Sequence, residues 1–160
     1  MDLVNKFKEE LVTAMKEKDK VKLSTLRSVK GAMQLEIINK KREENDELLL
    51  DCINKQIKLR NDSIKEFESA GRTDLVESYQ KEIDILKEYM PRMLSDDEIS
   101  DIIDNAISKT GASTVKDLGL VMREITPLVK NRCDMKKVTV LVREKLQWFF
   151  SFFFTKQKKR

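Results

Sequence analysis

The scarcity of glycine and proline constrains this chain more than any other feature of its sequence. Only four glycines and two prolines occur in 160 residues, too few to punctuate the many short strands of a β-sandwich or a β-barrel. Apolar residues recur instead every three or four positions along most of the chain, which is the pattern of amphipathic helices. The sequence therefore predicts an all-α protein.

Residues 1–90 carry the pattern of four successive helices. Asp2 can cap the first helix, Asp46 opens the third, and the fourth starts near Thr73. Pro91 stops the fourth helix, because proline disfavours helical geometry at the residue before it. We therefore expect an N-terminal four-helix domain over residues 1–90.

A second unit of three helices is expected over residues 95–147. Ser95-Asp96-Asp97-Glu98 has the spacing of a capping box, and Gly111 is suited to a left-handed stop at the end of the helix that follows. The next helix must end or kink at Pro127, and Asp134 caps the last one. These signals predict a small C-terminal three-helix bundle.

Residues 148–160 form an atypical aromatic and basic tail. They hold five of the seven phenylalanines, the only tryptophan, and four basic residues without an acidic one, so they supply the whole net charge of +4. The segment shows no helical periodicity. Three interpretations are open: translation beyond the usual stop, an anchor on an anionic membrane surface, or a tail that binds a partner.

The composition excludes most kinds of catalytic site. The chain has no histidine, the residue most used for acid–base catalysis near neutral pH and the commonest metal ligand. Its sequence contains neither a phosphate-binding glycine loop nor a nucleophile elbow. Asp97, Asp101 and Asp104 share one helix face, which is better explained as a solvated surface than as a cation site. We expect no catalytic residue, no metal and no cofactor.

The two cysteines and the amino terminus bear on location. Cys52 and Cys133 lie far apart among apolar helical positions, as buried thiols do. The chain begins without a secretory signal, and its one strongly apolar run, Trp148 to Phe154, is short for a membrane-spanning helix. We therefore expect a cytoplasmic protein with reduced thiols.

Basic residues near the turn at 111–117 and the connection at 126–137 are candidates for contact with RNA phosphates. Charge spacing alone favours the alternative of a salt-bridged solvent face. No aromatic residue is interleaved with them before the tail, which argues against base stacking and for contact with the RNA backbone or shape. The candidates are Lys109, Lys116, Arg123, Lys130, Arg132, Lys136 and Lys137.

Two stretches of the chain carry a specific pattern. The first is Gln56-Ile57-Lys58-x-Arg60-x-Asp62-Ser63-Ile64-x-Glu66-Phe67-x-x-Ala70-x-Arg72-x-Asp74-Leu75, followed by Glu82-Ile83-x-Ile85-Leu86-x-x-Tyr89-Met90-Pro91. The second comprises Gly111-Ala112-Ser113, Asp117-Leu118-Gly119-x-Val121-Met122 and Val142-Arg143-Glu144-Lys145-Leu146. Over about residues 1–146 the chain resembles the GatB/YqeY family.

The resemblance implies an all-α protein with two helical domains. Stand-alone members are similar to the tail of the B subunit of the tRNA-dependent amidotransferase, which contacts tRNA, while the catalytic steps belong to other domains and subunits. We therefore expect a non-catalytic accessory protein of translation that binds tRNA or associates with amidotransferase or aminoacyl-tRNA machinery. The alternatives are a component with glutamine-dependent carbon–nitrogen ligase activity and a helical protein-interaction module without RNA binding.

One departure from the family concerns its glycines. After Lys130 the family usually has a glycine-containing loop and Ala-Asp-Gly, whereas this chain has Asn131-Arg132-Cys133-Asp134-Met135. If those glycines let the backbone approach RNA, this chain binds RNA less well. Gly111 and Gly119 remain as candidates for close packing or ligand approach, since glycine costs about 1 kcal/mol relative to alanine inside a helix.

Overall fold

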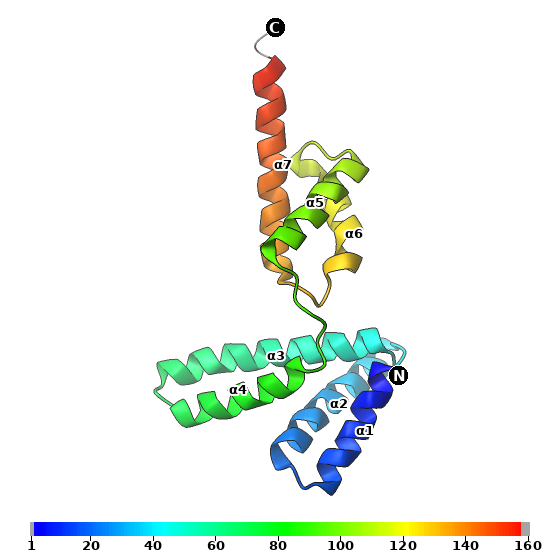
Figure 1. Ribbon diagram of the computed structural model, residues 1–160, viewed down its shortest axis with the longest axis vertical. Helices are drawn as coiled ribbons and strands as arrows, with labels where there is room; N and C mark the ends of the chain where they lie inside the picture. The colour runs from blue at the N-terminus through cyan, green and yellow to red at the C-terminus, as the bar shows by residue number, and fades with distance from the viewer. Residues whose placement is uncertain (1, 158–160) are drawn as a thin grey trace. The chain divides into compact units, whose positions relative to one another are not determined.

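The computed structural model shows a chain built from helices. It describes residues 2–157, with side chains as far as Phe152. Within these residues there are only helices and their connections, which confirms the prediction of an all-α protein. The elements shown in Figure 1 are α1 (Leu3–Lys16), α2 (Lys20–Lys40), α3 (Asp46–Ser69), α4 (Thr73–Lys87), α5 (Asp96–Thr110), the short 3₁₀ helix η1 (Val115–Asp117), α6 (Leu118–Val129) and α7 (Met135–Gln157).

The residues group into two compact units, Met1–Met90 and Pro91–Arg160. The first unit contains α1 to α4, and the second contains α5, η1, α6 and α7. Each unit buries an apolar cluster of its own. Burial of separate apolar clusters is the main favourable term in the folding of each unit.

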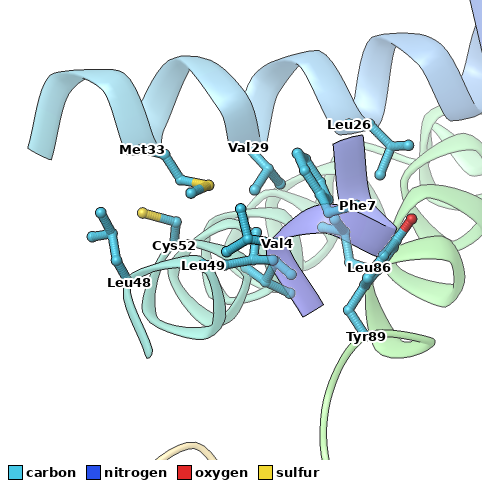
Figure 2. Close-up of a cluster of buried hydrophobic side chains, with 11 residues drawn as sticks. Val4, Phe7, Leu26, Val29, Met33, Leu48, Leu49, Cys52, Leu86 and Tyr89 are labelled. Atoms are coloured by element: carbon cyan, nitrogen blue, oxygen red, sulfur yellow. The ribbon is translucent and has the colours of Figure 1, made fainter. Parts of the chain in front are cut away.

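The first unit consists of two helical hairpins, α1 with α2 and α3 with α4 (Figure 1). Helix α3 contacts each of the other three helices. The ring of Phe7 in α1 meets the ring of Tyr89 edge-on, with centroids 5.6 Å apart. Figure 2 shows how the side chains of this cluster converge from all four helices and Tyr89: Val4, Phe7, Leu26, Val29, Met33, Leu48, Leu49, Cys52, Leu86 and Tyr89.

Carboxylates fix the beginning of the first helix. Asp2 accepts a hydrogen bond from the Val4 amide at 2.8 Å, as the sequence predicts. Asp46, at the start of α3, accepts from the amides of Val4 at 3.0 Å and Leu3 at 3.2 Å. These two backbone donors hold the pKa of Asp46 below its ordinary value. The first turns of α1 and α3 are thereby joined.

In the second unit α5 and α7 run parallel, and α6 returns the chain between them. Lys137 contacts Asp96 at 2.5 Å and Lys145 contacts Asp104 at 2.6 Å, and the partners in both pairs are 41 residues apart. The capping box is present, with the Glu98 amide donating to Ser95 Oγ and the Ser95 amide donating to the Glu98 carboxylate. Gly111 ends α5 in the left-handed conformation, with φ +66°, as predicted.

Helix α6 does not end at Pro127. It continues to Val129, so the proline lies in its last turn, where the missing amide removes only one helical hydrogen bond. The Thr126 hydroxyl donates to the Met122 carbonyl at 2.6 Å in the same region.

Helix α7 differs most from the prediction, because it continues through Gln157 into the segment read as a tail without periodicity. Phe149 packs against the apolar cluster of the second unit. Trp148 and Phe152, one turn apart, stack with their centroids 5.4 Å apart. A run of adjacent aromatic residues shows no 3.6-residue period of apolar positions, so the sequence does not predict a helix there. Extension of a helix that has already begun upstream costs less than nucleation of a new one, and α7 continues through these residues. Residues 158–160 lie outside the described part of the chain.

Candidate nucleic-acid interface

The structure places six of the seven basic candidates at two ends of the second unit and the seventh between them. Lys109 and Lys116 lie where α5 leads into η1, and four others lie at the connection between α6 and α7 or in the first turn of α7. Arg123 lies within α6, whose 12 residues span about 18 Å between the two groups. The candidates therefore do not form one compact cluster. The four at the α6–α7 connection are Lys130, Arg132, Lys136 and Lys137.

Lys109 and Lys137 form ion pairs within the described part of the chain. Lys109 contacts Glu124 on α6, and Lys137 contacts Asp96 at the start of α5. All four side chains are at least one third exposed, so each pair contributes at most about 1 kcal/mol to stability. For these two lysines the structure agrees with a salt-bridged solvent face.

Arg132 has a structural role in the loop before α7. Its Nε donates to the Arg92 carbonyl at 3.4 Å, and its own carbonyl accepts from the Leu94 amide at 2.8 Å. The neighbouring Asn131 is buried and left-handed, with φ +61°, a conformation that asparagine tolerates better than most residues with a Cβ. The loop thus adopts a glycine-like conformation at Asn131 without a glycine.

Three candidates keep exposed side chains without a partner in the part of the chain that the structure describes. They are Lys116 in η1, Arg123 in α6 and Lys136 in the first turn of α7. The Lys136 amide donates to Asp134 Oδ1 at 2.9 Å, which confirms the cap predicted there, while its ammonium group stays unpaired. These three charges remain available to phosphates.

Close packing does not account for the two glycines singled out in this unit. A Cβ built at Gly111 or Gly119 would meet no heavy atom within 4 Å in the described structure. Gly111 is explained by its positive φ. Gly119, exposed in the first turn of α6, lies in open space where an approaching ligand would not be obstructed.

A groove between η1 and α7 is lined by an aromatic residue and by one of the unpaired lysines. It has a volume of about 620 Å³. Lys116 and Phe150 lie 34 positions apart in sequence, and both line the groove because α7 extends past residue 147. The sequence does not reveal that these two residues share a groove, because the aromatic segment shows no helical periodicity and is expected to lie outside the three-helix unit. The lining residues are Thr114, Val115, Lys116, Gln147, Phe150 and Ser151.

Hydrogen bonds to Asp117 fix the rim of this groove. One carboxylate oxygen of Asp117 accepts from the amides of Ser113 at 3.0 Å and Thr114 at 2.9 Å, and from the Thr114 hydroxyl at 3.2 Å. The two backbone donors hold the pKa of Asp117 below its ordinary value. The turn that presents Thr114 and Lys116 is therefore held by its own hydrogen bonds.

The acidic and sulfur side chains show no metal-binding arrangement in the described residues, which contain no group of three or more candidate ligands. Asp104 pairs with Lys145. Cys52 is buried and Cys133 half-buried, and burial raises the pKa of both thiols. A raised pKa keeps a thiol protonated and weakly nucleophilic.

Fold and surface together define a helical protein of two units, the second with a groove and exposed basic side chains. The family model described as Yqey-like protein matches residues 4–146. The chain therefore belongs to the YqeY-like family, which confirms the resemblance drawn from its sequence motifs.

Among curated proteins, the chain is similar to proteins named "Altered inheritance of mitochondria protein 41, mitochondrial". The identity is 32% with that of Pyrenophora tritici-repentis (87% of this chain, 78% of the relative). It is 33% with that of Lachancea thermotolerans (68% and 60%) and 37% with that of Saccharomyces cerevisiae strain YJM789 (66% and 57%). The chain thus spans less than two thirds of the latter two relatives.

These names correct the expected location. The sequence alone favoured a cytoplasmic protein, but the relatives are named as mitochondrial proteins, which points to the mitochondrion. The prediction was wrong because it rested on the lack of a secretory signal and on the cysteines, neither of which reports on mitochondrial import. Within the described residues, no helix has both the length and the apolarity to cross a membrane.

Proposed function

We propose that this chain is a non-catalytic accessory protein that binds tRNA and acts beside an amidotransferase or other aminoacyl-tRNA machinery. The proposal is carried by one observation, the three exposed basic side chains of the second unit that pair with no described acidic group. When unpaired lysine and arginine side chains neutralise RNA phosphates, the counterions condensed on the RNA are released into solution. This release favours binding. Family membership supports the same proposal.

The test is an anisotropy titration of fluorescently labelled tRNA with the full chain at several salt concentrations. Three phosphate contacts predict that log K falls with log salt by a slope of about 2 to 3. Reversing the three charges, K116E with R123E and K136E, is expected to weaken binding at least 10-fold and to lower that slope. A tRNA affinity that is the same in the wild type and the charge-reversal variant, and that does not change with salt concentration, would contradict the proposal.

Two controls separate this surface from general electrostatic attraction. The variant K30E with K58E and K81E reverses three exposed lysines of the first unit that form no described ion pair, so it changes the net charge equally. It is expected to weaken tRNA binding less than threefold. Replacing the basic tail residues Lys156, Lys158, Lys159 and Arg160 by glutamine removes a polycation and keeps the chain length; binding lost in this variant alone would assign the affinity to the tail.

A glutaminase assay tests the absence of catalysis. The raised pKa of both thiols and the lack of histidine predict no release of ammonia from glutamine above background, because a cysteine nucleophile needs its thiolate. Ammonia release that disappears on replacement of Cys52 or Cys133 would show a glutamine-dependent enzyme instead. A stable complex with a protein partner, formed without any RNA binding, would identify an interaction module.

A further inference from the structure

We propose that the exposed face of α2 docks an amphipathic helix of a partner protein whose flanks carry acidic side chains. Three residues of α2 define this face, which we call the α2 stripe: Gly31, Leu35 and Ile38. They are spaced i, i+4 and i+7, so they lie along a single side of the helix. The inference concerns the first unit and a protein ligand, and it goes beyond the RNA binding proposed for the second unit.

The α2 stripe lies opposite the buried side of the helix. Leu26, Val29 and Met33 point from α2 into the apolar cluster of the first unit (Figure 2). Leu35 is 61% exposed and Ile38 is 73% exposed, the largest exposed fraction of a large apolar side chain in the described residues. Single exposed apolar residues are common on protein surfaces. Two of them at i and i+3 on one helix have the spacing of the anchors by which helices pack on each other.

Neither a positive φ nor close packing within the described residues explains Gly31. It lies in the middle of α2, where glycine is the least favourable helix residue after proline. A Cβ built there would meet no heavy atom within 4 Å in the described structure. A glycine on a helix surface lets the backbone of a second helix approach closely. Gly31, one turn from Leu35, therefore marks the point at which a docked helix crosses α2.

The charges beside the α2 stripe select the chemistry of the partner. Glu36 is the only acidic residue of α2, and Lys40 and Lys55 each donate to its Oε1 at 3.0 Å. Arg27 and Lys41 are exposed and pair with no described acidic group. They lie about one turn before and one turn after the α2 stripe, so each end of the stripe carries a free positive charge. Aspartate or glutamate on the partner helix complements these charges.

A second copy of the chain or a membrane fits the α2 stripe less well. A symmetric dimer through this face would bring Arg27 and Lys41 of one copy against the same residues of the other, and like charges repel. A helix that lies on a membrane buries bulky apolar side chains, whereas Gly31 contributes almost no apolar area. A glycine beside two apolar anchors instead suits the close packing of one helix on another.

The test is fluorescence anisotropy with the full chain and three labelled peptides of about 18 residues, long enough for a helix of about five turns. The first peptide repeats leucine every three or four positions among glutamates. The second has lysine in place of glutamate, and the third is a scrambled form of the first without periodicity. The first peptide is expected to bind at least about 10-fold more tightly than the others, since only it combines the apolar spacing with negative charge. Equal affinity for all three peptides would overturn the inference.

G31A has opposite expected effects on stability and on binding. Alanine favours the helix and meets no neighbour here, so the midpoint temperature of unfolding should rise by up to about 4–8 °C. Its methyl group holds a crossing helix away, so the affinity for the first peptide should fall at least about 5-fold. If G31A is more stable than the wild type but binds the first peptide equally well, the inference is wrong.

The apolar anchors are tested by L35A with I38A. This double variant is expected to bind the first peptide at least about 10-fold more weakly, because the two truncations remove apolar area from the contact. M15A is the matched control, at a 49% exposed residue of α1, and its affinity should stay within about twofold of the wild type. Circular dichroism of all variants establishes that the helices are intact. Equal effects of the double variant and the control would contradict docking on the α2 stripe.

The flanking charges are tested by R27E with K41E. This variant should weaken binding of the first peptide and reduce its dependence on salt concentration. K81E with K87E reverses two exposed lysines of α4, so it changes the net charge equally and should weaken binding less than about threefold. Equal losses in the two variants would show general electrostatic attraction instead of docking on α2.

Other occupants have their own signatures. If sedimentation equilibrium shows a dimer that L35A with I38A dissociates, a second copy of the chain occupies the α2 stripe and the inference is overturned. If phosphatidylserine vesicles capture the chain through Leu35 and Ile38 while no peptide binds, the stripe is a membrane surface and the inference is again overturned. Neither result bears on the proposed function, because the charge reversals that test tRNA binding lie in the second unit.

Discussion

Glu98 shows how one side chain of this protein can serve two neighbours. It accepts hydrogen bonds from the guanidinium of Arg92 at 2.5 and 3.2 Å and from the Ser95 amide at 2.9 Å. The Arg92 contact, followed by the Ser95 amide, lowers the pKa of Glu98 from its ordinary value of 4.5 to about 2. The ionised form therefore stabilises the folded second unit.

This lowered pKa predicts a pH dependence of stability. A carboxyl whose pKa is lower in the folded than in the unfolded state stabilises the protein fully above the unfolded value, and that contribution is lost as the pH falls. For Glu98 the loss is expected between about pH 4.5 and pH 2. Urea unfolding at a series of pH values should therefore show a steeper loss of stability for the wild type than for E98Q. Parallel curves for the two proteins would contradict the assignment.

At the scale of helices, Arg60 joins three elements of the first unit. Its guanidinium on α3 donates to Glu82 on α4 at 2.8 Å and to Ser28 on α2 at 3.1 Å, and it also contacts Gln56 within α3. Only 11% of the arginine side chain is exposed. The planar fork of arginine allows these contacts at once, which a single ammonium group does not.

We expect R60A to lower the free energy of unfolding of the first unit by about 3 kcal/mol, because it leaves the partly buried Glu82 carboxylate without its partner. R60K should recover less than half of that loss. R27A, at an exposed arginine of α2, should change stability by less than about 0.5 kcal/mol. Urea denaturation followed by circular dichroism measures all three variants. Equal stability of R60K and the wild type would show that charge alone is sufficient.

Local signals predicted the starts of α1 and α5 and the end of α5, whereas contacts between distant residues could not be predicted in the same way. The cap at Asp2, the capping box at Ser95 and the left-handed Gly111 all depend on residues within a few positions of each other. The ion pairs of Lys109 and Lys137 and the groove at Lys116 depend on how helices pack. Charge spacing along the sequence identifies basic residues, but it does not show which ones an acidic neighbour neutralises.

For the molecule as a whole, we propose that the two units are separate domains, with the first over residues 1–90 and the second including residues 95–147. Each unit has its own apolar cluster, and domains with separate cores commonly unfold separately. Calorimetry is therefore expected to show two transitions. R60A should lower the midpoint temperature of the first unit's transition only. S95A removes a helix cap worth about 1 kcal/mol, and it should lower the midpoint temperature of the second unit's transition only. A single transition shifted by both variants would contradict separate domains.

The parallel arrangement of α5 and α7 has a consequence for the order in which the protein forms during its synthesis. The partners in both ion pairs are 41 residues apart, and Val138, Val142 and Leu146 of α7 belong to the apolar cluster of the second unit. That cluster therefore stays incomplete until the ribosome has produced most of the last helix. The domain proposed for the first unit contains no residue beyond Met90. As a separate domain, it is expected to fold on the emerging chain while the second unit still exposes apolar side chains. A chaperone would therefore find its binding surface on the nascent second unit.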